Sequence, residues 1–123
     1  MASLADRVLD QGLNILDTEA NKITITSQES TTYASANSTH ALGASTSLNI
    51  GSPADRSGGG REVTVQAITD GSVSTSGTAT HYAILDTNNS RLLATGSLAS
   101  SQSVTSGNSF TLATFTIGIP DPA

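Results

Sequence analysis

Short runs in which aliphatic residues alternate with polar residues recur along most of this 123-residue chain. Ile23 and Ile25, for example, alternate with Thr24 and Thr26. Successive residues of a β-strand point to opposite sides, so this two-residue period places both isoleucines on one buried face. The sequence therefore predicts a strand at 22–26 and, by the same reasoning, further strands in the other alternating runs.

Turn-forming residues separate these runs. The clearest loop is 51–60, which holds one proline and three consecutive glycines, and Asp70-Gly71 is typical of a two-residue hairpin turn. The segment 29–44 is rich in small polar residues and is expected to be a loop with a short edge strand near 32–34. Strands are expected at 44–50, 62–69, 72–76, 78–86, 91–98 and 103–105, with turns at 87–90 and 107–108.

The last alternating segment changes its phase. Phe110 and Leu112 alternate in one phase, whereas the apolar residues of 115–119 alternate in the other. One residue between them must slip the register of the strand, which predicts a β-bulge at Ala113 or Thr114.

These patterns together predict the fold class. About seven or eight short strands, with turn signals at intervals of about eight to twelve residues, are typical of an all-β fold, a small β-sandwich or barrel that is jelly-roll-like. Only 3% of the residues are aromatic, so the core is thin and built from aliphatic side chains. We therefore expect oligomerisation or docking to contribute to stability.

The N-terminal segment has helical rather than alternating spacing. A serine suits the N-cap, and Leu4 and Val8 lie one helical turn apart. Gly12 is expected to end this helix after one or two turns, with the chain continuing in an extended form. The predicted organisation is an N-terminal arm, 1–21, and a β-sandwich domain, 22–123. The arm is either folded back on its own core or docked on a neighbouring subunit.

Composition excludes several classes of partner. The net charge is −5 and the chain has five Lys and Arg residues in total, whereas nucleic-acid binding needs clustered cations, so no nucleic-acid partner is expected. The first ten residues hold no apolar run that would suit a signal peptide or a membrane span. The expectation is a protein made in the cytoplasm that has no membrane partner.

No catalytic or metal-binding motif stands out in the sequence. The chain has no Cys, and Ser residues are so frequent that a Ser-His-Asp set has no specificity without the Gly-x-Ser-x-Gly turn. His40 and His81 lack a metal-ligand spacing, and Gly58-Gly59-Gly60-Arg61 lacks the Lys-Ser or Lys-Thr of a phosphate loop. We therefore predict no enzyme activity, no cofactor and no metal.

Two phrases of the sequence resemble small structural proteins encoded among the head genes of tailed phages. They are Ala5-Asp6-Arg7-Val8-Leu9-Asp10-Gln11-Gly12-Leu13-Asn14, and Ala79-Thr80-His81-Tyr82-Ala83-Ile84-Leu85-Asp86 with the following Arg91-Leu92-Leu93-Ala94-Thr95-Gly96. The resemblance implies a capsid decoration or cement protein, which binds the outside of the major capsid protein lattice and stabilises it. It also implies a homo-oligomer, with a trimer as the expected form, located on the virion after synthesis in the host cytoplasm.

The interface hypothesis combines the arm with the glycine-rich loop. The candidate interface residues are Leu4, Val8, Leu9, Leu13, Ile15 and Leu16 in the arm and Pro53, Asp55 and Arg56 in the loop. Two alternatives stay open. One is a tail or head-fibre component, and the other is a β module that binds carbohydrate or the host surface. Such a module normally stacks aromatic rings on sugars, and this chain offers only Tyr33 and Tyr82 for that purpose.

Overall fold

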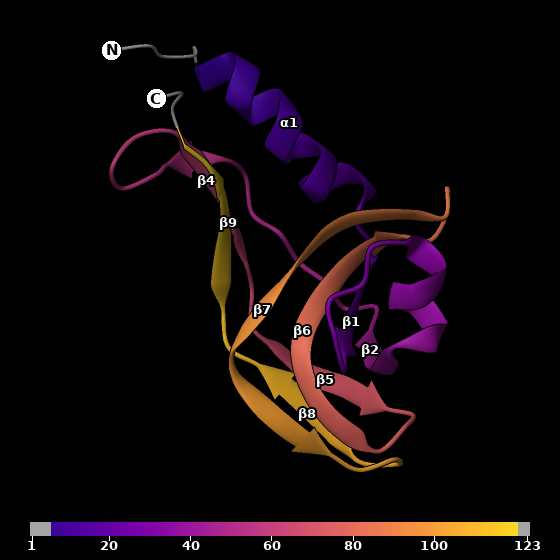
Figure 1. The fold of residues 1–123 in the computed structure, drawn as a ribbon. Helices are drawn as coiled ribbons and strands as arrows, with labels where there is room; N and C mark the ends of the chain where they lie inside the picture. Colours follow the sequence, from indigo (N-terminus) through magenta and orange to yellow (C-terminus); the bar gives the residue numbers. More distant parts are fainter. Residues whose placement is uncertain (1–5, 121–123) are drawn as a thin grey trace. The chain divides into compact units, whose positions relative to one another are not determined.

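A computed structural model describes residues 6–120 of the chain. Within this range, nine strands form two antiparallel sheets, one of six strands and one of three, together with an N-terminal α-helix and a short π-helix (Figure 1). The predicted all-β fold class is confirmed.

The chain divides into two compact units, each built from separate segments. Unit 1 combines the N-terminal helix with 49–67 and the chain from residue 113 onward, and unit 2 combines 20–48 with 68–112. The predicted division into an arm, 1–21, and a domain, 22–123, differs from the division into these two units. The N-terminal helix groups with segments from the middle and the end of the chain.

Unit 1 consists of one helix on a small sheet. Its sheet has the order β3-β4-β9, and its elements are α1 (Asp6–Glu19), β3 (Ala54–Asp55), β4 (Arg61–Val65) and β9 (Phe115–Ile119). β4 and β9 pair without a register shift, with Val63 opposite Ile117. The helix buries Leu9, Leu13 and Leu16 against this sheet. The spacing of these leucines, i, i+4 and i+7, places them on one helical face.

The helix is longer than the sequence suggested. α1 runs for 14 residues and passes through Gly12, so the predicted end at that glycine is wrong. A glycine inside a helix costs about 1 kcal/mol relative to alanine, and burying a single leucine stabilises by more than that. Gly12 faces the sheet closely, because a Cβ at this position would lie 3.5 Å from Cδ1 of Ile119.

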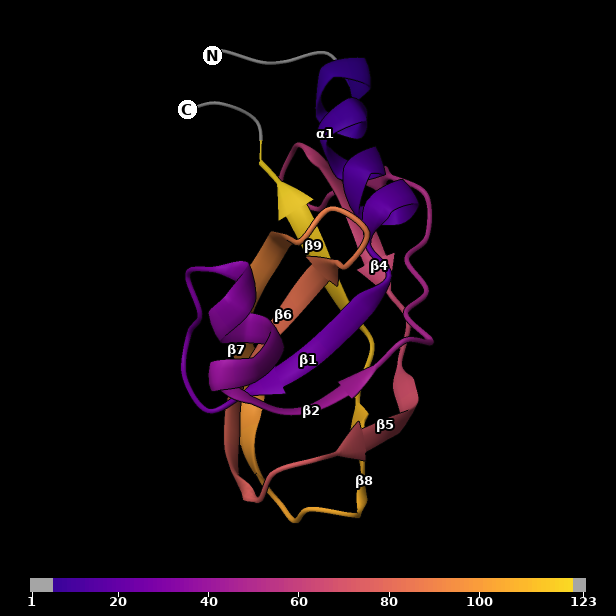
Figure 2. The ribbon, with the colours of Figure 1, turned by 90° about the vertical axis from the view of Figure 1, so that its right-hand side faces the viewer.

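Unit 2 is a six-stranded sheet with the order β7-β6-β1-β2-β5-β8, and it curls along its length (Figures 1 and 2). Its strands are β1 (Lys22–Thr26), β2 (Ala41–Ser45), β5 (Ile68–Val73), β6 (Gly77–Asp86), β7 (Arg91–Val104) and β8 (Ser109–Leu112). The π-helix η1 (Ser35–Thr39) connects β1 to β2.

The central strand β1 confirms the prediction at 22–26 and adds to it. Ile23 and Ile25 are fully buried as expected, but Thr24 and Thr26 are fully buried as well. Thr24 donates a hydrogen bond of 3.0 Å from Oγ1 to the carbonyl oxygen of Ala36 in η1. The second face of β1 is therefore covered by η1, and a hydroxyl group can be buried there because it has a partner.

The segment between β1 and the glycine-rich loop was predicted incorrectly. The expected loop 29–44 contains η1 and most of β2. In the expected strand 44–50, Ala44 and Ser45 end β2, and Ile50 forms an isolated bridge with Val65. β2 lies between β1 and β5, so its ladder hydrogen bonds favour a strand even though its sequence, ALGAS, has a low strand propensity.

Asp70-Gly71 is not a hairpin turn, because β5 continues through both residues. Gly71 pairs with Phe110 of β8, and a Cβ on Gly71 would clash with the Phe110 ring. The glycine is therefore needed where the aromatic ring lies on the strand, and the chain turns instead at 74–76.

Two predictions near the C-terminus have different outcomes. The turn at 87–90 is confirmed, and it joins β6 to a β7 that extends beyond 91–98 to Val104. The phase change after Leu112 is not a β-bulge within one strand. The chain leaves the six-stranded sheet at Leu112 and enters the three-stranded sheet at Phe115, so two strands in different sheets carry the two phases.

Candidate functional site

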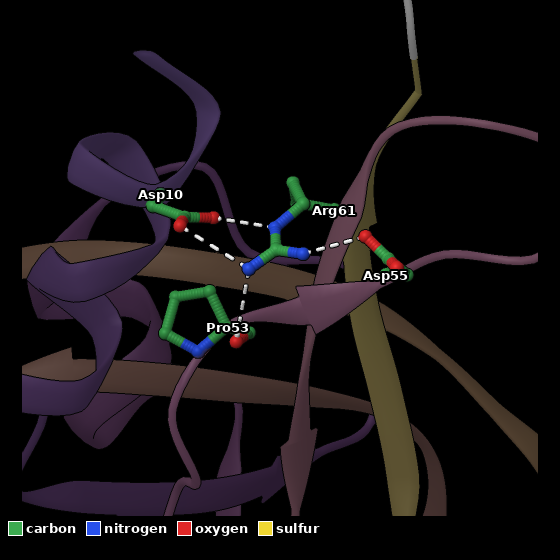
Figure 3. A network of polar contacts seen from close by, with 4 residues as sticks. All are labelled: Asp10, Pro53, Asp55 and Arg61. Carbon is green, nitrogen blue, oxygen red and sulfur yellow. Dashed lines mark hydrogen bonds and ion pairs between the residues drawn. The ribbon is translucent and has the colours of Figure 1, made fainter. Parts of the chain in front are cut away.

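The Arg61 side chain joins three segments of unit 1 (Figure 3). Its Nε donates to Oδ1 of Asp10 in α1 at 2.8 Å, and its Nη1 donates to Oδ1 of Asp55 in β3 at 2.6 Å. Its Nη2 donates at 3.3 Å both to Oδ2 of Asp10 and to the carbonyl oxygen of Pro53. Arg61 itself belongs to β4, so one guanidinium group connects the helix, the loop and the sheet.

The two ion pairs of this network differ in burial. The side chains of Arg61 and Asp10 are 16% and 27% exposed, whereas that of Asp55 is 89% exposed. The two-point contact with Asp10 is thus shielded from water, while water screens the contact with Asp55. Asp10 and Arg61 are 51 residues apart, so no local pattern in the sequence relates them.

The glycine-rich loop, 51–60, contains the short strand β3 and, at 56–60, a hydrogen-bonded turn. The backbone N–H of Arg56 donates to the carbonyl oxygen of Gly60, and that of Gly59 donates to the carbonyl oxygen of Arg56, both at 3.1 Å. Gly58, Gly59 and Gly60 have φ angles of 89°, 107° and 93°, which side chains rarely tolerate. The three glycines therefore allow this turn, whose internal hydrogen bonds could not be predicted from the sequence.

The structure separates the predicted interface residues into two groups. Leu9, Leu13 and Leu16 are buried within their own unit, so their side chains are not accessible to a partner in this conformation. Val8 and Ile15 are 56% and 44% exposed. In the loop, Asp55 is exposed whereas Pro53 and Arg56 are partly buried, and Leu4 lies outside the described residues.

The exposed apolar residues of α1 lie on one side of the helix, which we call the apolar flank and define as Val8, Gly12 and Ile15. Their spacing, i, i+4 and i+7, aligns them along the helix. Asp10 is about 160° around the helix from Gly12, at about 100° per residue, and it faces Arg61. Gly12 faces Ile119 of β9, so the apolar flank lies on the β9 side of the helix.

The two histidines form hydrogen bonds with different partners. A ring nitrogen of His40, Nε2, lies 3.0 Å from Nε2 of Gln28, and Nδ1 of His81 lies 2.8 Å from Oγ1 of Thr80. Within residues 6–120, no group of three or more His, Cys, Asp or Glu residues is placed to hold a metal ion. Each histidine thus has a side-chain hydrogen-bond partner within unit 2.

Asp70 forms a hydroxyl cluster that the sequence did not indicate. Ser47 donates to Oδ2 of Asp70 at 2.6 Å, and Ser45 donates to Oδ1 at 3.0 Å. The hydrogen bond from Ser47 is the largest cause that lowers the pKa of the Asp70 carboxyl group, and the hydrogen bond from Ser45 lowers it further. The carboxylate holds the end of β2 against β5, which is a structural role.

Asp86 ends β6 and organises the turn that follows it. Its Oδ2 accepts a hydrogen bond of 2.8 Å from the side chain of Asn89, and its Oδ1 accepts one of 3.1 Å from the backbone N–H of Asn88. The hydrogen bond from Asn89 is the largest cause that lowers the pKa of Asp86, and the nearby charge of Arg91 lowers it slightly further.

This lowered pKa predicts how stability depends on pH. The carboxylate of Asp86 stabilises the fold at pH values above the pKa of an unfolded aspartate, about 3.9, and this contribution is lost as the pH falls through the lower folded value. We expect urea unfolding midpoints of the wild type to fall more steeply below about pH 4 than those of Asp86→Asn. Equal slopes in the two proteins would contradict the assignment. Asp70, whose pKa is also lowered, is present in both proteins, so its contribution to the pH dependence does not affect this comparison.

Arg61 allows a second prediction, about the network in Figure 3. Arg61→Met keeps the apolar stem but removes the guanidinium group, so we expect the free energy of unfolding to fall by about 1–2 kcal/mol, measured by urea denaturation. Asp55→Asn is the matched control, because its exposed ion pair is worth less than about 1 kcal/mol. Equal losses in both variants would show that Asp10 is not the main partner of Arg61.

Comparison with known proteins gave no match, since no family model, curated protein or solved structure is similar to this chain at a significant level. No helix within residues 6–120 is long and apolar enough to cross a membrane.

Proposed function

We propose that this chain is a structural virion protein of a tailed phage, which binds the outer surface of the capsid lattice and stabilises it. The observation that carries the proposal is the Arg61 network, which holds loop 51–60 in a defined turn with exposed residues at its tip. A loop that is already ordered loses less conformational entropy on binding. Such a loop on a β scaffold suits recognition of a fixed surface.

The proposal assigns different surfaces to different partners. Loop 51–60 contacts the major capsid protein, and Asp55 and Arg56 supply opposite charges that favour one orientation on the lattice. The apolar flank of α1 is left for contact with another copy of the chain. Each contact binds the folded state and therefore stabilises a chain whose aromatic content is low.

Co-sedimentation with assembled heads of the encoding phage tests this function. We expect saturable binding of the purified protein, and we expect decorated heads to release their DNA at a higher temperature than bare heads. Ser57→Trp places a large side chain at the exposed loop tip and should weaken binding by at least about tenfold, or about 1.4 kcal/mol.

Ser101→Trp is the matched control, because Ser101 is an exposed serine of β7 in unit 2. It should bind heads as the wild type does. Wild-type protein that ignores heads overturns the proposal. If binding survives Ser57→Trp unchanged, the loop assignment is wrong.

The alternative functions receive less support from the described side chains. Tyr33 packs against a buried cluster of Ala36, Ala83 and Leu85, and the Tyr82 ring covers Gly96 of the neighbouring strand. Burial raises the pKa of the Tyr82 hydroxyl. Both rings pack against other residues of unit 2, which does not favour stacking on sugars. Binding to purified tails or to host cells, without binding to heads, would favour these alternatives.

A further inference from the structure

Edge strands are usually protected from pairing with other chains by short length, bulges or charges. Four strands lie at sheet edges, namely β3 and β9 in unit 1 and β7 and β8 in unit 2. β3 has only two residues, and the pairings of β7 and β8 with their neighbours both contain register shifts. β9 has five residues, FTIGI, with no charge, and its pairing with β4 is regular.

The strand β9 is also exposed where a partner would approach. Thr116 and Gly118 are exposed, while Ile117 and Ile119 on the helix-covered face are only partly buried. The apolar flank of α1 lies beside these isoleucines, because Gly12 contacts Ile119. An unprotected edge and an exposed apolar helix side therefore form one continuous surface within unit 1.

We infer that this surface, β9 together with the apolar flank, binds the same surface of a second copy of the chain. β9 pairs antiparallel with β9 of the other copy, and the two three-stranded sheets become one sheet of six strands. A two-fold axis perpendicular to the sheet places both α1 helices on the same face, as an isologous contact requires. This contact needs no capsid and so extends beyond the proposed function.

The dimensions of the paired sheets fit this arrangement. α1 contacts both β4 and β9, so its axis lies between zero and one strand spacing inside the β9 edge strand. Across two adjoining β9 strands, the two helix axes are then about one to three strand spacings apart, or about 5–14 Å. Packed helices lie at about 8–10 Å, which falls within this range, so the apolar flanks can touch.

Charge and shape also suit a second copy as the occupant. Val8 and Ile15 lie on either side of Gly12 along the helix, and both are exposed. Asp10 and Asp17 lie on the opposite side of the helix, so their like charges do not face one another across the axis. The interface is small, which predicts a dissociation constant on the order of micromolar.

Sedimentation velocity over a range of concentrations tests the contact. We expect a reversible dimer for the wild type and a dissociation constant raised by at least about tenfold in Val8→Lys/Ile15→Lys. The matched control is Gln11→Lys/Thr18→Lys, which adds the same two charges to exposed positions on the solvent side of α1 and should dimerise as the wild type does. Circular dichroism of both variants establishes that α1 is folded.

Hydrogen exchange locates the contact independently of mutation. Backbone amides of β9 should become protected as concentration rises, while those of the edge strands β7 and β8 should not change. A monomer at all concentrations, a trimer, or protection elsewhere than β9 overturns the inference. The capsid assignment is tested separately by head binding of Ser57→Trp, so failure of either proposal leaves the other intact.

Discussion

We expect Leu13→Ala to lower the free energy of unfolding by about 2–5 kcal/mol, one of the largest effects of any single substitution in α1. The Leu13 side chain is only 2% exposed and packs between the helix and the small sheet of unit 1. Its removal would leave a cavity that the surrounding strands fill only partly. Urea denaturation followed by circular dichroism measures the loss.

Ile15→Ala is the control, because Ile15 is of similar size and lies two residues further along the same helix. Its side chain is 44% exposed, so the loss should stay below about 1 kcal/mol when measured at concentrations where the protein is monomeric. Similar losses at both positions would show that α1 does not use the leucine face for its own core, and would favour an arm that docks elsewhere.

We expect Gly71→Ala to destabilise unit 2 by about 3 kcal/mol, in the upper part of the range for overpacking. The added Cβ would enter the space of the Phe110 ring, which is itself buried. The ring cannot move freely, because a neighbouring glycine, Gly43, also lies against it, with its own missing Cβ only 3.0 Å from Cε1 of Phe110. Thermal and urea unfolding measure the effect.

Gly51→Ala controls for the general effect of replacing a glycine. A Cβ at Gly51 would have its nearest neighbour at 3.9 Å, so this variant should be neutral or more stable by up to about 1 kcal/mol. A double-mutant cycle with Phe110→Leu identifies the cause. Gly71→Ala should cost markedly less in the Leu background, and equal costs in both backgrounds would show that strain at the glycine, not the ring, is responsible.

The predictions for Leu13 and Gly71 both test which residues are buried in the chain's own core. α1 uses three leucines internally and leaves the apolar flank for other molecules. A stable helix is therefore a requirement for the proposed self-association. Leu13→Ala should weaken dimerisation indirectly, whereas Val8→Lys/Ile15→Lys should weaken it without loss of stability.

Much of the strand content could be predicted from local patterns. The alternation around Ile23 and Ile25 identified β1, and the turn at 87–90 was recognised from its polar residues. Loop 51–60 was also recognised from its three consecutive glycines and its proline, except that the two-residue strand β3 lies within it. Period and turn chemistry are properties of neighbouring residues, so one sequence is enough to read them.

The errors occurred where distant contacts override local preference. Gly12 suggested a helix end, but the leucine face packs on β4 and β9, which come from the middle and the end of the chain. Gly71 suggested a turn, but Phe110, 39 positions away in the sequence, needs a strand without a side chain there. Neither partner can be recognised from the residues around the glycine.

The sequence by itself determined the class of fold, the approximate position of the main loop and an acidic net charge, because each depends on composition or on short-range period. Only the tertiary structure decided which strands lie at the edges, which side of α1 stays exposed, and that Arg61 joins Asp10 to the loop. Those properties arise when segments distant in sequence compete to bury the same apolar surface, and that competition is resolved only in three dimensions.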